Sequence, residues 1–303
     1  MMRFYDFGEI IKKDTRFCIF GIPWDYLTSI DLPNSAIAPK EIRKVTNNLA
    51  LTTEMGSEIP SLPIVDLGDI NIEKMNVEQN LKEIDKFIKR IYNQKSDIIP
   101  VMIGGDHFCS YPVIKAIGDK FNDKKKIGIL IFDSHLDLYH EWDKGVYSHA
   151  TITHRVLDLP YFTNRNIMVL GTRDIDIPEM KIAQDEKIKY FNSFYLEEIG
   201  FTTYFQEVKR FFKNSEIESL YVSIDIDALD PSVAQATGYA IPGGFTYREM
   251  WKFLRTLTKE FSIIGFDLVE VAPNLDTQNR ITCNLAAKLI IEFISFIDKR
   301  GEF

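Results

Sequence analysis

The chain has few of the features that define secreted and membrane proteins. Its three cysteines, Cys18, Cys109 and Cys283, are an odd number with no CxxC spacing, so we expect reduced thiols and no disulfide framework. No window holds 18 uncharged apolar residues, which argues against a membrane-spanning helix. The opening residues, MMRFYDFGEI, lack the apolar core of a signal peptide. These absences predict a cytoplasmic protein with no membrane partner.

The chain also lacks an excess of positive charge. Its formal net charge is −8 and its pI is about 5.3. An acidic protein repels nucleic acid and attracts small cations, so we expect no nucleic-acid partner and favour a cationic substrate. No repeat, low-complexity tract or Gly/Ser linker interrupts the sequence. We therefore expect a single domain over residues 1–303, although length alone would allow two.

The sequence contains a succession of short apolar runs. They are nearly continuous in apolar character, as expected for strands of a parallel sheet that is buried on both faces. The runs are 16-RFCIFGIP, 62-LPIVDLGD, 98-IIPVMIGGD, 127-IGILIFD, 167-IMVLGTR, 219-SLYVSIDID and 262-SIIGFDLVEV.

Amphipathic segments lie between these runs. Asn76 can cap a helix whose apolar residues recur every three or four positions as far as Ile91. The capping box 246-TYRE begins another helix, and residues 285–296 have the pattern of a third. The alternation of strand and helix predicts a doubly wound α/β fold with helices on both faces of the sheet.

Acidic residues and histidines follow several of the predicted strands. Residues i, i+2 and i+4 of a strand face the same side, so Asp133, His135 and Asp137 should converge as their strand ends. Asp225 and Asp227 repeat this spacing, and a third strand end carries 104-GGDH. Sites of open parallel sheets lie at the carboxyl ends of the strands. The predicted metal ligands are therefore His107, Asp133, His135, Asp137, Asp225 and Asp227.

The charge of this set favours two metal ions over one. Four carboxylates would leave buried negative charge unmatched beside a single divalent cation, whereas two cations neutralise them. Two neighbouring ions can also activate water. A set rich in oxygen with few imidazoles suits Mn²⁺, while Zn²⁺, Ni²⁺ and Co²⁺ stay open. A single DxD or DxH motif is more often a turn or a helix cap. All five histidines fall between His107 and His154, however, which a dispersed structural role does not predict.

Four segments together resemble the ureohydrolase family, which includes arginase, agmatinase and their relatives. They are 104-GGDH, 133-DSHLD, 223-SIDIDALDP and 242-PGG, and the likeness extends from 21-GIPWD to the last predicted helix. The resemblance implies a three-layer αβα sandwich around a mostly parallel sheet. It also implies two Mn²⁺ ions per chain and a homo-oligomer, either a trimer or a hexamer.

The resemblance also assigns roles to residues. It implies that one ion binds His107, Asp133, Asp137 and Asp225, and that the other binds Asp133, His135, Asp225 and Asp227. Glu270, in 270-EVAP, matches the glutamate that binds the guanidinium group, and His149, in 148-SHAT, matches the histidine that transfers a proton. Without the family, Glu270 could be an ion-pair partner at a strand end and His149 a surface residue.

The position two residues after the DxHxD motif favours agmatinase over arginase. Arginases have an asparagine there for the substrate's α-carboxylate, whereas this chain has Tyr139. The implied reaction converts agmatine and water to putrescine and urea, with Glu270, Tyr139 and His149 binding substrate and with His149, Asp137 and Glu270 catalytic. Arginase, or another guanidino or formimino hydrolase, is the alternative within the family.

Several residues depart from the family pattern. Phe108 replaces a serine, Ala150 a glycine and Ser134 an alanine, while Tyr239 stands near the position of a threonine. The loop 33-PNSAIAPKEIR differs as well. These changes bear on the substrate more than on hydrolysis. Two further alternatives are a single-zinc deacetylase of acylated amines and a non-catalytic metal-binding or assembly protein.

Overall fold

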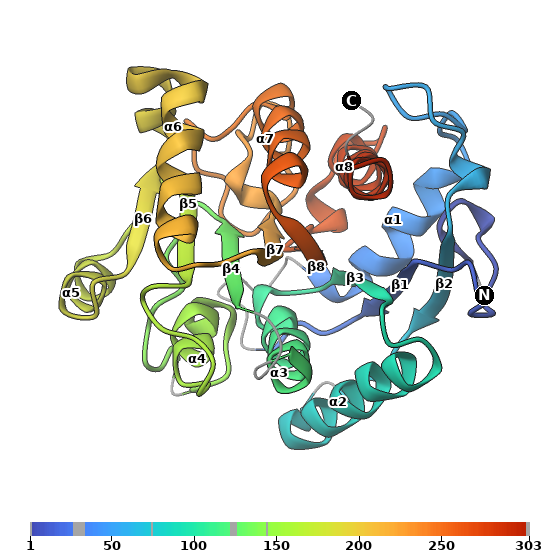
Figure 1. Ribbon diagram of the computed structural model, residues 1–303, viewed down its shortest axis with the longest axis horizontal. Helices are drawn as coiled ribbons and strands as arrows, with labels where there is room; N and C mark the ends of the chain where they lie inside the picture. The colour runs from blue at the N-terminus through green and yellow to red at the C-terminus, as the bar shows by residue number, and fades with distance from the viewer. Residues whose placement is uncertain (1, 27–33, 74, 122–125, 144, 301–303) are drawn as a thin grey trace.

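The computed structural model describes residues 2–26, 34–73, 75–121, 126–143 and 145–300. Within these residues eight strands form one sheet in the order β2-β1-β3-β8-β7-β4-β5-β6, and every neighbouring pair is parallel (Figure 1). The strands are β1 (Phe17–Ile22), β2 (Ile64–Asp69), β3 (Ile99–Gly104), β4 (Ile127–Phe132), β5 (Ile167–Thr172), β6 (Lys189–Asn192), β7 (Ser219–Asp225) and β8 (Ser262–Val269).

The apolar runs of the sequence all form strands, and one further strand has no such run. β6 has the sequence KYFN, lies at the edge of the sheet and buries one of its four residues, Phe191. An edge strand pairs on one side and needs little apolar surface, so its composition does not distinguish it from a loop. The prediction was incomplete for this reason.

Helices cover both faces of the sheet. On one face lie α1 (Ala38–Thr46), α6 (Phe194–Asn214), α7 (Tyr247–Glu260) and α8 (Ile281–Asp298), and on the other lie α2 (Val77–Gln94), α3 (Ser110–Phe121), α4 (Ile152–Leu157) and α5 (Ile177–Asp185) (Figure 1). The predicted α/β fold, a three-layer αβα sandwich around a parallel sheet, is confirmed.

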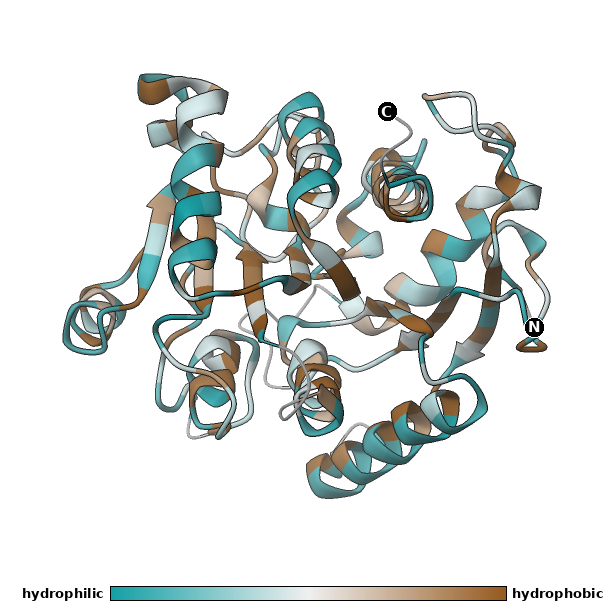
Figure 2. Cartoon of the chain, viewed as in Figure 1, coloured by the Kyte–Doolittle hydropathy of each residue, from teal (hydrophilic) through white to brown (hydrophobic). Residues whose placement is uncertain are grey.

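Two apolar clusters separate the three layers. Alternate residues of a strand point to opposite faces, so Phe17 and Ile19 of β1 join one cluster while Cys18 and Phe20 join the other. In Figure 2 the brown of hydrophobic residues is prominent on the central strands. Burial of the strands on both faces explains why their sequences are continuously apolar.

The predicted helix starts are formed by side-chain caps. The side chain of Asn76 accepts a hydrogen bond of 3.1 Å from the amide of Gln79 at the start of α2. Thr246 and Glu249 form a reciprocal capping box at the start of α7. Such caps satisfy amide groups that have no partner inside the helix.

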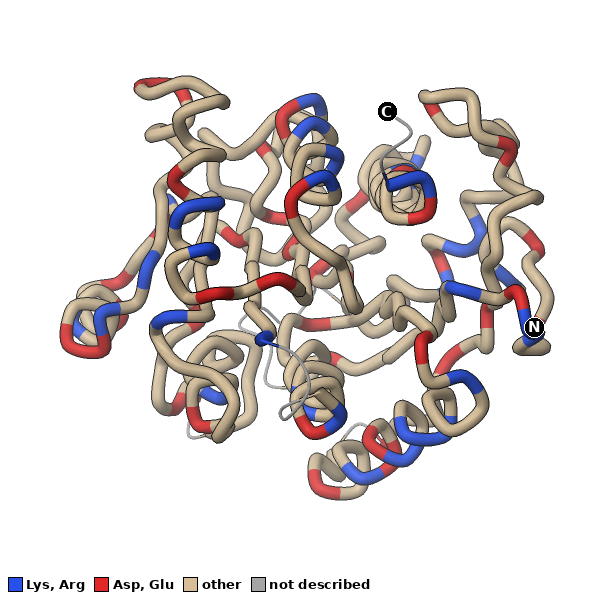
Figure 3. The backbone as a smooth tube through the Cα atoms, viewed as in Figure 1, with Lys and Arg blue, Asp and Glu red and all other residues tan. Residues whose placement is uncertain are grey.

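Charged residues of the surface pair with one another along the helices. Figure 3 shows charges of both signs along α2, whose Lys86 and Lys89 pair with acidic residues one turn away. Over the described ranges, no helix combines the length and the apolar character that crossing a bilayer requires. The three cysteines are buried and free.

The strand order determines where polar side chains can meet. The four central strands are β3, β8, β7 and β4, and they are parallel, so the segments that follow them emerge at one edge of the sheet. We call this side the carboxyl edge. All described strands belong to one sheet, but a single domain over residues 1–303 stays a prediction.

Candidate metal centre

Close contact between two segments of the chain positions the first candidate ligand. The Gly105 amide, just after β3, donates a hydrogen bond of 3.0 Å to the carbonyl of Ile22. A Cβ atom on Gly105 would lie 2.0 Å from the carbonyl oxygen of Trp24. Glycine is therefore required here, because any side chain would push the two segments apart. The segment after Gly105 leads into the 3₁₀ turn that begins at His107.

The segment after β4 differs from the prediction that Asp133, His135 and Asp137 alternate along a strand. β4 ends at Phe132, so Asp133, His135 and Asp137 lie in the following loop and not on a pleated strand. Asp137 has a φ of 49°, in the left-handed region. The His135 amide donates to Asp133 Oδ1 at 2.6 Å. The three side chains do converge, but the hydrogen bonds and this turn of the loop bring them together.

The loop after β7 is tied to the loop after β4. Asp225 is the last residue of β7, and Asp227 lies in a one-turn 3₁₀ helix. The Asp227 amide donates to Asp225 Oδ1 at 2.8 Å, and Asp227 Oδ1 accepts from the amide of Ser134 at 3.0 Å. The carboxylates of Asp225 and Asp227 thus fix the loop after β7 and connect it to the loop after β4.

The six predicted ligands gather at the carboxyl edge. His107 Nδ1 lies 2.9 Å from Asp133 Oδ2, 2.9 Å from Asp137 Oδ2 and 3.4 Å from Asp225 Oδ2. His135 Nδ1 lies 3.4 Å from Asp133 Oδ1 and 3.1 Å from Asp227 Oδ2. We call these six residues the ligand cluster: His107, Asp133, His135, Asp137, Asp225 and Asp227.

Two overlapping groups within the ligand cluster have the spacing of metal sites. The ligand atoms of His107, Asp133 and Asp225 lie within 4.8 Å of one another, as do those of Asp133, His135 and Asp227. Asp133 is common to both groups, which is the arrangement expected of a bridging ligand. Asp225 joins only the first group, and Asp137 joins neither. The ligand roles of all six residues stay predictions.

The unpaired atoms of the ligand cluster fit divalent cations. Both His107 Nδ1 and Asp133 Oδ2 are buried and make no hydrogen bond with any described residue. A buried polar atom without a partner costs about 1–3 kcal/mol. A cation between them would satisfy both atoms and neutralise the surrounding carboxylates, so the donor set fits a pair of divalent ions.

The pKa values of the carboxylates reflect how closely they are packed. Burial raises the pKa of Asp137 and Asp225 well above the usual value, and neighbouring carboxylates raise it further. Burial would also raise the pKa of Asp133, but its contacts with His107 and His135 lower it. Repulsion among closely packed, buried carboxylates is therefore the main electrostatic feature of the centre.

The two histidines respond in the opposite direction. Burial alone would lower the pKa of His107, but Asp133, Asp137 and Asp225 raise it well above the usual value. The pKa of His135 is also raised, because the carboxylates of Asp227 and Asp133 outweigh burial. In the absence of cations, the two imidazolium groups supply the positive charge.

Glu270 lies directly behind the ligand cluster. It follows β8 with a φ of 62°, and its Oε1 accepts a hydrogen bond of 2.7 Å from the amide of His107. Burial and the charge of Asp106 raise its pKa to about 8. No lysine or arginine in the described part of the chain pairs with Glu270, so the ion-pair alternative is not observed.

A pocket of about 230 Å³ opens beside the ligand cluster. Its wall contains His135 and Asp137 together with the predicted substrate residues Tyr139 and His149. Glu270 is not part of this wall. The remaining lining residues are acidic, aromatic or aliphatic: Trp142, Ala150, Asp174, Ile175, Asp176, Glu179 and Tyr239.

The wall of this pocket is acidic, and the nearest arginine is engaged elsewhere. Tyr139 donates a hydrogen bond of 2.6 Å to Asp176. Burial raises the pKa of Glu179 to about 7. Arg173 donates to the carbonyl oxygens of Asp227 at 2.6 Å and Ile241 at 2.7 Å. Its guanidinium is thus used to hold loops, and no described lysine or arginine lines the pocket.

His149 has different surroundings from His140 and His154. His149 lines the pocket, with Nδ1 3.2 Å from Ser148 Oγ and its ring 6.4 Å from that of Trp142. The rings of His140 and His154 meet edge to face outside the wall, with their centroids 3.9 Å apart, and burial and His140 lower the pKa of His154 to about 4. Of these three histidines, His149 alone lines the pocket.

The departures from the family pattern occupy different places. Phe108 is fully buried and packs against the rings of Trp24, Tyr111 and Tyr147. Tyr239 is at the pocket, 39% exposed, with its ring 5.7 Å from that of His135. Residue 33 of the altered loop lies outside the described residues.

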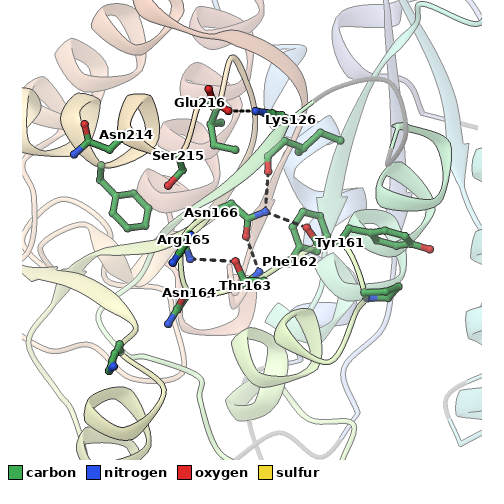
Figure 4. A pocket seen from close by; sticks show the side chains of 15 residues that line it. Lys126, Tyr161, Phe162, Thr163, Asn164, Arg165, Asn166, Asn214, Ser215 and Glu216 are labelled. Carbon is green, nitrogen blue, oxygen red and sulfur yellow. Dashed lines mark hydrogen bonds and ion pairs between the residues drawn. The ribbon is translucent and has the colours of Figure 1, made fainter.

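A larger cavity, of about 1310 Å³, lies at the opposite ends of the strands (Figure 4). Asn166 donates hydrogen bonds to the carbonyls of Ile127 and Tyr161, and Lys126 pairs with Glu216. These bonds connect loops to one another, as Figure 4 shows. The ligand cluster is at the other edge of the sheet, so the size of this cavity does not indicate the site.

A buried polar group that the sequence did not single out supports His107. The Nε2 atom of His107 lies 3.0 Å from Ser223 Oγ, and Ser223 in turn contacts Asp267. Ser223 belongs to the motif 223-SIDIDALDP, whereas Asp267 interrupts an apolar strand. A charged residue inside a strand buried on both faces is a signal that could have revealed it.

Comparison with known proteins agrees with this geometry. The chain is 29% identical to an arginase of Medicago truncatula, covering 93% of this chain and 82% of the relative. It is 28% identical to an agmatinase of Pyrococcus horikoshii, covering 93% and 92%. An agmatine ureohydrolase structure from Thermoplasma volcanium superposes with a TM-score of 0.85 at 27% identity, covering 99% and 95%. The arginase family model matches residues 15–295. With nearly the whole chain matched in sequence and fold, the protein belongs to the arginase family.

Proposed function

We propose that this protein is an agmatinase, which hydrolyses the guanidinium group of agmatine to give urea and putrescine. The observation that supports this substrate is the acidic pocket beside the ligand cluster, whose described lining contains no lysine or arginine. Agmatine is a dication, whereas arginine and formiminoglutamate carry carboxylates that such a wall would repel. The proposal specifies a substrate, whereas membership of the family does not, because the similar proteins include both arginases and agmatinases.

The ligand cluster would hold the two metal ions. His107, Asp133, Asp137 and Asp225 would bind one ion, and Asp133, His135, Asp225 and Asp227 the other. Bound divalent ions would supply Lewis-acid activation of water. Manganese is the metal that we propose, because the donor set is rich in oxygen.

Protein side chains would orient the substrate and transfer the proton. Glu270 is proposed to receive the N–H groups of the guanidinium, since a carboxylate pairs well with such a planar cation. Asp137 lines the same pocket and can accept a hydrogen bond from the attacking water. His149 is proposed to pass a proton to the departing amine, a role suited to a side chain that titrates near neutral pH.

The distal end of the substrate would lie against Tyr139 and Asp176. The Tyr139 hydroxyl donates to Asp176, which holds that carboxylate at the pocket wall. The distal ammonium of agmatine can pair with Asp176, with Asp174 nearby in the same wall. This arrangement would give each cationic end of the substrate a carboxylate partner.

Urea release from a panel of substrates tests the proposal. The panel contains agmatine, arginine, guanidinobutyrate and formiminoglutamate, and we expect agmatine to be the preferred substrate. Asp227→Ala and His135→Ala should abolish urea release and reduce bound metal. A preference for arginine would replace the substrate but keep the chemistry, while full activity of either variant would refute the binuclear centre. One ion per chain would favour the deacetylase alternative.

Further proposals rest on the family resemblance. They are a homo-oligomer, either trimer or hexamer, and a cytoplasmic location in which the product putrescine serves polyamine synthesis. Sedimentation analysis tests the first, and fractionation of cells tests the second.

A further inference from the structure

Two aromatic side chains that the proposed function leaves without a role line the pocket beside the ligand cluster. Trp142 and Tyr239 belong to its wall, together with Tyr139 and His149. The wall also carries carboxylates, and none of its described residues is lysine or arginine. A lining of aromatic rings and carboxylates suits an organic cation that has apolar surface as well as charge.

The backbone fixes Trp142 at the wall. Its amide donates a hydrogen bond of 2.9 Å to the carbonyl of Gly145, and the Gly145 amide donates one of 2.8 Å to the carbonyl of Trp142. Asp143, directly after Trp142, has a φ of 44°, in the left-handed region that tight turns use. The indole is half-buried, so a tight turn of the backbone holds an aromatic surface that stays accessible from the pocket.

The rings of the wall stand at steep angles to one another. The Trp142 ring lies 4.9 Å from that of Tyr139, with 61° between their planes, and 6.4 Å from that of His149, with 71°. The planes of Tyr239 and His135 make an angle of 75°. Rings inclined in this way form a corner and not a flat stack. Aromatic corners of this kind are used to bind alkylated ammonium groups.

A carboxylate stands beside this corner. The Tyr139 hydroxyl donates to Asp176 Oδ2 at 2.6 Å, so the acid lies next to the ring that contacts Trp142. Asp176 is exposed, and solvent screening weakens the attraction between an exposed carboxylate and a cation. The ring faces therefore supply a substantial share of the attraction for a cation at this end of the pocket.

The chemistry of the distal nitrogen decides how well such a corner binds it. A primary ammonium has three N–H donors, and each needs an acceptor once water is removed. A fully alkylated ammonium has no N–H donor, and a ring face attracts it electrostatically without a hydrogen bond. A corner that offers ring faces and one exposed carboxylate thus suits the alkylated cation.

We propose that Trp142 binds the distal cation of the substrate through its ring face, and that the protein therefore also hydrolyses guanidino compounds whose distal nitrogen is N-alkylated. This inference rests on the proposed function, since the chemistry at the guanidinium end is the same. The water oxygen bonds to the guanidinium carbon, and the bond from that carbon to the alkyl-bearing nitrogen breaks. This nitrogen takes both protons of the water and leaves as an ammonium group. Trimethylated agmatine would give urea and (4-aminobutyl)trimethylammonium.

Two other roles of Trp142 predict different outcomes. If the indole only packs the pocket loop, its loss lowers activity on every substrate by the same factor. If it contributes apolar area alone, leucine replaces it and the distal charge makes no difference. The matched control is 5,5-dimethylhexylguanidine, which has the shape of trimethylated agmatine but a carbon atom in place of the charged nitrogen.

The test combines turnover with a binding measurement that needs no turnover. Urea release from agmatine, trimethylated agmatine and the neutral isostere is measured for the Mn²⁺-loaded parent and for Trp142→Phe and Trp142→Leu. Butyltrimethylammonium is then titrated against tryptophan fluorescence. The chain has three tryptophans, and of these Trp142 alone lines the pocket, so quenching that is lost in Trp142→Leu reports binding at this residue. Melting curves show that each variant is folded.

We expect the parent to hydrolyse trimethylated agmatine with a kcat/KM at least equal to that for agmatine. Trp142→Leu should lower this kcat/KM about 5- to 30-fold, the equivalent of about 1–2 kcal/mol, and should leave that of the neutral isostere within about twofold. Trp142→Phe keeps a ring face and should retain more activity on the cation than Trp142→Leu. Butyltrimethylammonium should quench the fluorescence of the parent and not that of Trp142→Leu.

Equal losses on the cation and on its neutral isostere in Trp142→Leu would assign Trp142 to packing and overturn the inference. A parent that releases urea from agmatine but not from trimethylated agmatine would overturn it as well. A parent that binds butyltrimethylammonium at Trp142 yet releases urea from none of the three substrates would instead overturn the proposed function and leave the cation site in place, so the two failures are distinct.

Discussion

Metal binding by this protein should depend steeply on pH. Without cations, the pKa values of His107 and His135 lie well above the usual value, because carboxylates surround both rings. Both histidines therefore carry an additional proton at neutral pH. A metal ligand must be unprotonated, so each ion has to displace a proton from its imidazole.

The number of displaced protons gives the size of the effect. One proton released per ion raises the affinity about tenfold per pH unit, or about 1.36 kcal/mol. Loading of both ions should therefore strengthen about 100-fold per pH unit at pH values below the raised pKa values of the two histidines. The raised pKa values of Asp137 and Asp225 act in the same direction, since these carboxylates must also lose any bound proton. Affinity thus rises with pH.

Calorimetry can count these protons directly. Chelator-treated protein is titrated with Mn²⁺ at pH 7 in buffers that differ in ionisation enthalpy, and the slope of the observed heat against that enthalpy equals the protons released. We expect at least two per chain. His135→Ala should release about one fewer, whereas His140→Ala, outside the pocket wall, should match the parent. Binding without proton release, or with equal affinity at pH 6.5 and 7.5, would refute the reasoning.

Three further perturbations have defined outcomes. Removing the ions with a chelator should lower the melting temperature by about 4 °C relative to protein at 100 times the Kd of one ion, since such binding adds about 2.7 kcal/mol; a melting curve without that shift would argue against specific sites. Asp176→Asn should raise KM for agmatine about fivefold, the effect of about 1 kcal/mol at an exposed charge pair, and should leave butylguanidine, which lacks the distal amine, unaffected. His149→Ala should lower kcat about 100-fold or more while bound metal stays constant; loss of metal as well would instead assign His149 to the centre.

The fold was largely predictable because burial on both faces leaves a strong pattern in the sequence. Each strand other than β6 lies in a largely apolar run, and the caps at Asn76 and Thr246 lie where the sequence predicts helices to begin. β6 was not predicted, because an edge strand of four residues needs little apolar surface. Patterns of burial thus predict the interior of a sheet better than its edges.

The site was predictable in its residues but not in its backbone. The six side chains of the ligand cluster gather as expected, yet Asp133, His135 and Asp137 lie on a loop, and alternation along a strand does not explain their convergence. Asp137 and Glu270 both have positive φ angles, which residues with side chains rarely adopt. Such conformations persist where surrounding contacts fix them, and local sequence does not encode those contacts.

The positions of the family departures indicate which property of the enzyme has diverged. Phe108 is sealed within an aromatic cluster, where it packs the segment at Tyr147 without facing a carboxylate of the ligand cluster. Ala150 and Tyr239 line the pocket instead, and neither carries a group that a cation of the centre would require. Substitutions at these three positions can change which molecule fits while the carboxylates of the ligand cluster stay in place. Ser134 differs from them, because its Oγ lies 3.1 Å from His135 Nδ1 in the ligand cluster. We therefore expect exchanging Tyr239 for threonine to change the ranking of substrates in the urea assay and to leave metal stoichiometry unaltered; loss of bound metal in that variant would contradict the separation of wall from centre.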